Sequence, residues 1–272
     1  MHAIVVGAGF GGIAAALRLR AKGYEVTLID RCNHIGGRAR VFEREGFRHD
    51  AGPTVITAPF LFEELFALFN ESFYDHVRLV PLTPWYRFAF RDGSRFDYGG
   101  TLEQTLAEIR RIEPRDVEGY LALLRHSQRI FDVGFTQLSA QPFHRLWTML
   151  RQIPSLLRLR SHETVWQMVS RFLCSPKLRR AFSIQPLLVG GNPFDTTSIY
   201  GLIHYLERAY GVHFAMGGTG AITRALEDLM RRQGVRILLD TTVSALQVSG
   251  KRAEAVILAD GTVMAADVIV SN

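Results

Sequence analysis

A glycine-rich turn near the N-terminus constrains the fold of this chain more than any other feature. Residues 7–12, Gly-Ala-Gly-Phe-Gly-Gly, fit the pattern G-x-G-x-x-G. The turn follows an apolar run over 3–6 that is typical of a buried strand, and it opens a helical pattern over 11–22. A second strand is predicted over 26–29 and finishes at Asp30. This order of elements predicts a Rossmann-type dinucleotide-binding unit.

Each residue of the pattern has an expected role. Gly7 permits the tight turn, Gly9 lets the backbone approach a pyrophosphate, and Gly12 allows the helix to pack closely on the strand. The phosphates would lie at the helix N-terminus, where free N–H groups and the helix dipole favour negative charge. Asp30 would accept hydrogen bonds from the adenosine ribose hydroxyls. A purely structural glycine turn is the alternative.

A second glycine motif, Gly36-Gly37-Arg38, follows Asp30. Paired glycines allow a second loop to approach the same phosphates, and an arginine there can clamp them with its fixed fork of donors. Arg40 lies close by, and its role stays open. Together the two motifs resemble those of the large flavoprotein superfamily that includes amine oxidases and carotenoid desaturases, a resemblance that implies FAD as the dinucleotide.

The remaining chain changes from mixed α/β structure to helices and back. Turn residues Glu45-Gly46 and Asp92-Gly93 predict hairpins over 40–49 and 85–98. Helices are predicted from the N-cap residue Thr101 to about residue 210. The last part predicts one helix and four strands, over 220–233, 235–239, 243–248, 252–259 and 263–270.

The fold class expected is therefore α/β, with a Rossmann-type FAD-binding domain interrupted by an insertion. The FAD-binding domain would have two parts, residues 1–56 and 213–272. The insertion, residues 57–212, would be mostly helical with β-hairpins, and it would bind the substrate or a membrane.

Further segments resemble bacterial phytoene desaturases and are spread in order over nearly the whole chain. They are His-Asp-Ala-Gly-Pro-Thr-Val-Ile-Thr at 49–57, Pro-Arg-Asp at 114–116, Leu-Val-Gly-Gly-Asn-Pro-Phe at 188–194, Ser-Ile-Tyr at 198–200, Leu-Glu-Arg at 206–208 and Gly-Gly-Thr-Gly at 217–220. The chain resembles the N-terminal part of a phytoene-desaturase-type carotenoid dehydrogenase. Family members carry a second glycine-rich FAD segment near the C-terminus, to which nothing in this sequence is similar.

The resemblance implies FAD-dependent desaturation of phytoene or a similar colourless precursor to a conjugated carotenoid such as neurosporene or lycopene. The expected cofactor-binding residues are Gly7, Gly9, Gly11, Gly12, Asp30, Arg31, Gly36, Gly37, Arg38 and Val243. The candidate catalytic residue is Arg151, a cation after an apolar run, although it could instead reach a lipid head group. Alternatives are a related FAD-dependent carotenoid isomerase or saturase, and a truncated, non-catalytic dinucleotide-binding fragment that holds FAD poorly.

The distribution of charge indicates the partner. Residues 141–180 contain eight Lys or Arg and one acid, and they carry a net charge of +7 in a chain whose total is +6. Apolar residues interleave with these cations, which favours an anionic membrane surface over nucleic acid, because no nucleic-acid-reading motif is present. Helices with solvated basic faces are the alternative.

No apolar run of about 18 residues or more is present, so a spanning helix is not expected. The apolar N-terminal stretch is interrupted by glycines and lacks a preceding basic region, so it is not a signal peptide. Cys32 and Cys174 make neither a disulfide framework nor a metal cluster. We therefore expect a cytoplasmic protein, peripheral to the inner face of the cell membrane, with a polyene substrate, no metal and no nucleic-acid partner.

Overall fold

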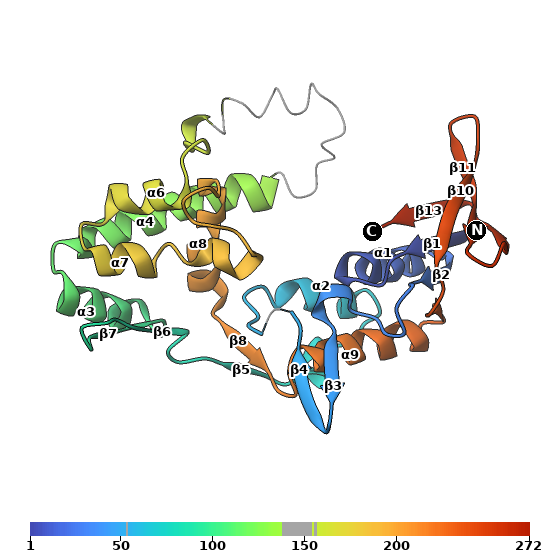
Figure 1. The fold of residues 1–272 in the computed structure, drawn as a ribbon, viewed down its shortest axis with the longest axis horizontal. Coiled ribbons are helices and arrows are strands. Elements are labelled where there is room, and N and C mark those ends of the chain that lie inside the picture. The colour runs from blue at the N-terminus through green and yellow to red at the C-terminus, as the bar shows by residue number, and fades with distance from the viewer. Residues whose placement is uncertain (53, 138–153, 155–156) are drawn as a thin grey trace. The chain divides into compact units, whose positions relative to one another are not determined.

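The computed structural model describes residues 1–52, 54–137, 154 and 157–272 (Figure 1). Its contacts divide the chain into two compact units. Unit 1 comprises Met1–Val80 and Phe214–Asn272, and unit 2 comprises Pro81–His213. The two boundaries lie within the short strands β5 (Leu79–Pro81) and β8 (His213–Ala215).

Unit 1 is built on a four-stranded parallel sheet. Its strands, in spatial order, are β13 (Val268–Ser271), β1 (His2–Val6), β2 (Glu25–Ile29) and β9 (Arg236–Leu238). A parallel sheet is covered on both faces, which explains why β1 and β13 carry apolar residues at successive positions rather than at alternate ones. β1 and β2 pair in register from His2 with Glu25 to Val6 with Ile29.

Helices cover one face of this sheet. The alternate residues Ala3 and Val5 of β1 face a core that also contains apolar side chains of α1 (Phe10–Ala21) and α9 (Thr219–Arg232). α2 (Phe60–Ala67) joins the same core through Leu65 and Phe66, both almost fully buried.

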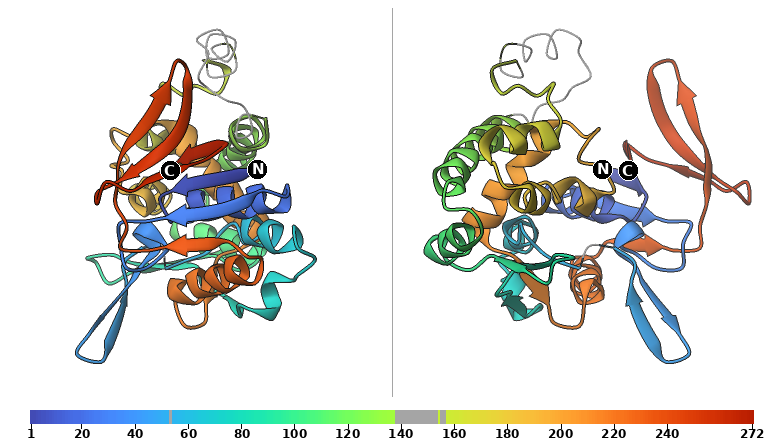
Figure 2. Two further views of the ribbon diagram at one scale, coloured as in Figure 1. Left: turned by 90° about the vertical axis from the view of Figure 1, so that its right-hand side faces the viewer. Right: turned by 60° about the vertical axis from the view of Figure 1, so that its left-hand side comes forward.

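An antiparallel sheet covers the other face. Ile4, which points opposite to Ala3 and Val5, packs with Val256 and Leu258. The latter two belong to the three-stranded sheet of β10 (Val243–Ser249), β11 (Arg252–Leu258) and β12 (Val263–Ala265). Figure 2 shows the long β10–β11 hairpin in red. The predicted hairpin over 40–49 is also present, as β3 (Val41–Arg44) and β4 (Phe47–Asp50).

Unit 2 is mostly helical. It contains α3 (Leu102–Ile112), α4 (Asp116–Phe131), α6 (Val165–Phe172), α7 (Pro176–Ala181) and α8 (Leu202–Tyr210), with short helical turns at Asp132–Gln137, Gln185–Val189 and Ser198–Gly201. The predicted hairpin over 85–98 is present as β6 (Tyr86–Ala89) and β7 (Arg95–Tyr98). Thr101 caps α3 in a reciprocal capping box with Gln104, as its sequence position predicts.

The predicted fold class is confirmed, since a Rossmann-type α/β unit is interrupted by a mostly helical one. The single strand predicted over 263–270 is wrong: β12 and β13 are separate strands in different sheets. The chain changes sheet at Asp267, whose backbone N–H donates to the His2 carbonyl and whose carboxylate accepts from the His2 N–H at 2.8 Å.

The first boundary between the units also differs from the expected 56/57. It lies at 80/81, because α2 and Phe73 bury their apolar side chains in the core of unit 1. An apolar helix looks the same in sequence whichever core receives it.

Candidate dinucleotide-binding site

The glycine turn lies at the carboxyl end of β1, where a parallel sheet presents its ligand-binding edge. The Gly7 N–H donates to the Ile29 carbonyl at 2.8 Å, and Gly7 has a φ of 99°, which favours glycine. A Cβ on Gly12 would stand 1.8 Å from the Gly7 carbonyl oxygen. Gly12 therefore permits the close passage of α1 over the turn, as predicted.

Gly9 is the N-cap of α1, and its surroundings differ from those of Gly12. Within the described part of the chain, a Cβ on Gly9 would meet only the Asn272 side-chain nitrogen, at 3.2 Å. The described residues supply α1 with no side-chain cap and no acid in its first turn. Its first N–H groups and the positive end of its dipole can therefore serve an anion, which is the arrangement that a pyrophosphate requires.

Asp30 ties the turn together from the end of β2. Its Oδ2 accepts from the Ala8 N–H at 2.6 Å, and its Oδ1 accepts from the Cys32 N–H at 2.8 Å. Each carboxylate oxygen can accept a further bond. The structure thus gives Asp30 a role in holding the turn, which the sequence did not suggest, and its contact with a ribose stays a prediction.

The second glycine motif lies directly against the first. The Gly36 N–H donates to the Ala8 carbonyl at 2.7 Å, and Gly36 and Gly9 form an isolated parallel bridge. A Cβ on Gly37 would stand 3.1 Å from the Gly9 Cα. The paired glycines therefore allow this loop to reach the turn, and the exposed Arg38 follows immediately.

The remaining predicted residues lie around this core. Arg31 is exposed directly after Asp30, and Val243 starts β10, where it packs with the core on the sheet face opposite to α1. Arg40 places its guanidinium 4.3 Å from the centre of the Phe42 ring, a cation–π contact within the first hairpin. Arg151 lies outside the described residues.

Asn272 is a site residue that our sequence reasoning missed. Its N–H donates to the Val6 carbonyl at 2.9 Å at the end of β13. Its side-chain oxygen stands 2.2 Å from the position that a Cβ on Gly11 would take. The sequence shows a polar residue directly after the last predicted strand. It does not show that this strand pairs with β1, because that pairing is a long-range contact.

The sequence segments 49–57 and 217–220 meet beside the site. Asp50 Oδ2 accepts from the Thr219 N–H at 3.1 Å, so the segment 49–57 reaches the N-terminus of α9. A Cβ on Gly52 would collide with the Arg38 carbonyl oxygen at 2.4 Å. Gly52 therefore allows its segment to pass close to the backbone of the second glycine motif.

Neither a metal-binding cluster nor a membrane-spanning helix is found among the described residues. No group of three or more His, Cys, Asp or Glu in this part of the chain is placed to hold a metal ion. No helix there is both long and apolar enough to cross a bilayer.

Comparison with known proteins identifies the family. A sequence profile of flavin-containing amine oxidoreductases matches residues 10–272. The chain belongs to this family. The match implies FAD as the cofactor, and the family is one of flavin-containing oxidoreductases.

Relatives with assigned activities include two bacterial proteins. The lycopene-forming phytoene desaturase of Pseudescherichia vulneris is 45% identical over 269 residues, which are 99% of this chain and 55% of that protein. The neurosporene-forming phytoene desaturase of Rhodobacter capsulatus is 39% identical, over 100% of this chain and 52% of its own length. The chain thus spans about half the length of these relatives.

Solved structures agree on the fold. An oxidoreductase from Methanosarcina mazei superimposes with a TM-score of 0.67 at 20% identity, over 100% of this chain and 58% of that one. Putrescine oxidase bound to putrescine gives a TM-score of 0.65 at 16% identity, over 99% of this chain and 57% of that one. At these identities the likeness shows the fold alone.

Proposed function

We propose that this protein takes part in the FAD-dependent desaturation of phytoene or a similar polyene in carotenoid biosynthesis, with products such as neurosporene or lycopene. The observation that carries the proposal is the contact between the two glycine motifs, Gly9 against Gly36 and Gly37, at the uncapped N-terminus of α1. The lycopene-forming and neurosporene-forming relatives supply the substrate class.

The residues of the site divide the binding of FAD among them. The N–H groups after Gly9 and the dipole of α1 would hold the pyrophosphate, and the exposed Arg38 would clamp it with its fork of donors. Asp30 would use its free lone pairs for the adenosine ribose, with Arg31 and Val243 beside the adenosine half. FAD, when bound, accepts the hydride that leaves the substrate.

A polyene substrate offers no charged group for recognition, so it must be bound by burial of apolar surface, at about 25 cal/mol per Å². The protein contributes by orienting the chain of the substrate and by excluding water from the reacting carbons. Arg151 remains the proposed catalytic residue, as a cation that stabilises developing charge. An Arg151→Gln variant that keeps FAD but loses turnover would support that role.

We further propose that unit 2 contacts the inner face of the cell membrane from the cytoplasm, where such a substrate dissolves. Unit 2 exposes large apolar side chains at Leu157, Leu187, Val189 and Phe194, which are each more than half exposed. The segment 141–180, which contains Leu157, carries eight Lys or Arg and one acid. This combination of exposed apolar groups and cations suits an anionic membrane interface.

The experiment is expression of the gene in a host that accumulates phytoene, followed by pigment spectroscopy. The proposal predicts coloured polyenes with extended conjugation. Geometric isomers of the supplied polyene would favour the isomerase alternative, and more saturated products would favour the saturase. Unchanged phytoene in cells that contain the folded flavoprotein would contradict the proposal.

A further inference from the structure

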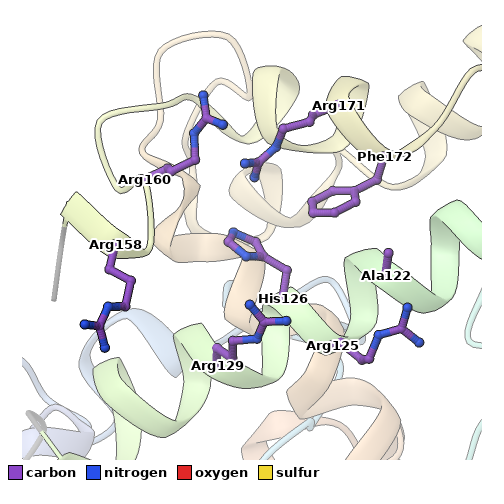
Figure 3. A pocket seen from close by; sticks show the side chains of 8 residues that line it. All are labelled: Ala122, Arg125, His126, Arg129, Arg158, Arg160, Arg171 and Phe172. Carbon is purple, nitrogen blue, oxygen red and sulfur yellow. The ribbon is translucent and has the colours of Figure 1, made fainter.

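Unit 2 contains an arginine-lined cavity of about 320 Å³ between α4, α6 and the loop before α6 (Figure 3). Its size lies at the small end of the range of about 300–1,000 Å³ found for ligand pockets. Five of its eight lining residues are arginines. The lining is Ala122, Arg125, His126, Arg129, Arg158, Arg160, Arg171 and Phe172.

The positive charge of this arginine pocket is only partly balanced. Glu163 forms ion pairs with Arg160 at 2.7 Å and with Arg171 at 3.3 Å. The other three arginines, 125, 129 and 158, form no ion pair with any described residue. Arg125 and Arg129 also lie one helical turn apart on α4, a spacing at which like charges destabilise a helix. An anion in the pocket would remove this repulsion.

His126 is a second indication of a missing partner. Its side chain is buried, and its Nε2 has no hydrogen-bond partner among the described residues. Figure 3 shows the ring among the arginines. Burial, and then the nearby Arg171 and Arg129, lower the pKa of His126, so the ring stays neutral and can donate through Nε2.

The backbone at the pocket is also unusual. Arg160 has a φ of 55°, in the left-handed region that non-glycine residues rarely adopt. Its carbonyl accepts from the Ser198 hydroxyl at 3.1 Å and from the Glu163 N–H at 2.9 Å, which hold this conformation. Backbone strain of this kind clusters at functional sites.

We propose that the arginine pocket binds a phosphate-bearing anion. Guanidinium groups bind phosphate oxygens through paired N–H donors, and several of them around one cavity suit a multiply charged phosphate. The cations surround a single cavity rather than forming a stripe, which favours a small phosphate group over a nucleic-acid strand. The proposal concerns unit 2 alone and does not depend on flavin chemistry.

The shared chemistry leaves two sources, a soluble phosphate and the head group of an anionic lipid. The purified 272-residue chain is titrated with inorganic pyrophosphate in a calorimeter. In a second arm it is sedimented with vesicles of phosphatidylcholine alone and of phosphatidylcholine with phosphatidylglycerol. Sedimentation is repeated in the presence of pyrophosphate, at constant ionic strength.

The test variant replaces the three unpaired arginines, Arg125→Gln, Arg129→Gln and Arg158→Gln. The matched control, Arg91→Gln, Arg95→Gln and Arg110→Gln, removes the same charge from exposed positions of unit 2 away from the cavity. We expect the pocket variant to bind at least about tenfold more weakly and the control less than about twofold. Circular dichroism checks that both fold. The single variant Arg158→Gln should by itself weaken binding by about threefold or more.

Each arm has a decisive result. Pyrophosphate binding that the pocket variant loses, with vesicle binding unchanged, assigns the site to a soluble phosphate. Vesicle binding that pyrophosphate competes away, and that the pocket variant loses, assigns it to a lipid head group. The proposal is overturned if the parent binds neither probe, or if the pocket and control variants lose binding equally.

Discussion

Gly9 and Gly12 lie in one turn, but an added methyl group should affect ligand binding at Gly9 and stability at Gly12. At Gly12 the added carbon would collide with the Gly7 carbonyl at 1.8 Å, which is a rigid backbone atom. At Gly9 its nearest described neighbour would be the end of the flexible Asn272 side chain, at 3.2 Å. The first substitution therefore tests the fold, and the second tests the ligand.

Gly12→Ala should lower the free energy of unfolding by at least about 2 kcal/mol, because the turn must open to admit the methyl group. Gly134→Ala is the control, since its nearest neighbour would be a Leu202 side-chain carbon at 3.9 Å. We expect the control to change the free energy by less than about 1 kcal/mol. Urea denaturation measures both, and a Gly12→Ala protein as stable as its parent would refute the close-packing role.

Glu207 is a fully buried carboxyl group in unit 2, and it accepts a hydrogen bond from the Tyr86 hydroxyl at 2.9 Å. Burial raises its pKa to about 7. Between pH 4.5 and 7 the folded state keeps a proton that the unfolded state has lost, so this group makes stability fall as pH rises. The buried His204, whose pKa burial lowers to about 4, acts in the opposite direction, because the unfolded state gains a proton below pH 6.5.

Glu207→Gln removes the first effect and leaves the second. The difference in free energy of unfolding between variant and parent should therefore shift in favour of the variant by about 3 kcal/mol as pH rises from 4.5 to 7. Groups common to both proteins cancel in this difference. Urea titrations across that range measure it, and a difference independent of pH would contradict the assignment of a raised pKa.

Among single residues, the packing role of the glycines was the feature best predicted from the sequence. The close approach at Gly12 follows from the known geometry of the turn. The use of Asp30 by the Ala8 and Cys32 N–H groups could not be predicted, because it depends on the path of the loop after the strand. Asn272 required knowledge of which strand lies beside β1.

Among the elements, α4 shows how one motif residue joins distant segments. Asp116, in the first turn of α4, is fully buried, and its two oxygens accept from the N–H groups of Cys174 at 2.6 Å and Ser175 at 2.8 Å. It thereby fixes the connection between α6 and α7. This explains the Asp of the Pro-Arg-Asp motif in structural terms.

Asp116→Ala should destabilise the protein by at least about 2 kcal/mol, since the N–H groups of Cys174 and the buried Ser175 would lose their fully buried acceptor. Asp195→Ala is the matched control, because Asp195 is exposed and its carboxylate accepts, among the residues that the structure describes, only from the nearby Asn192 side chain at 2.8 Å. We expect a change of less than about 1 kcal/mol there. Chemical denaturation compares the two, and equal losses would contradict the anchoring role.

The predicted helices and strands were correct where residues a few positions apart determine the structure. Both hairpins and the α3 cap follow from turn and capping residues that act within a few positions. The prediction of one strand over 263–270 failed because the apolar residues on both sides of Asp267 resemble a single strand, although the chain changes sheet there. Only the pairing of β13 with β1 reveals the break.

At the scale of the whole molecule, the predicted cofactor-binding residues all belong to unit 1. The order of α/β, helical and α/β regions was readable from periodicity, but the boundary at 80/81 depends on which core receives α2. Sequence periodicity carries no information on that choice.

This division predicts where FAD protects the chain. A ligand stabilises the state that binds it, so amide hydrogen exchange on addition of FAD should slow in residues 1–80 and 214–272. The strongest effect is expected around the first turn of α1. Mass spectrometry of peptic fragments measures the pattern, and protection confined to residues 81–213 would contradict the location of the site.

FAD affinity, measured by flavin fluorescence, shows whether the turn at Gly9 binds the dinucleotide. The parent, Gly9→Ala and Gly134→Ala are compared after circular dichroism has shown that all three are folded. We predict that Gly9→Ala weakens binding by at least about tenfold, because its methyl group enters the space of the pyrophosphate, while Gly134→Ala binds as the parent does. Equal FAD affinity in all three proteins would contradict it.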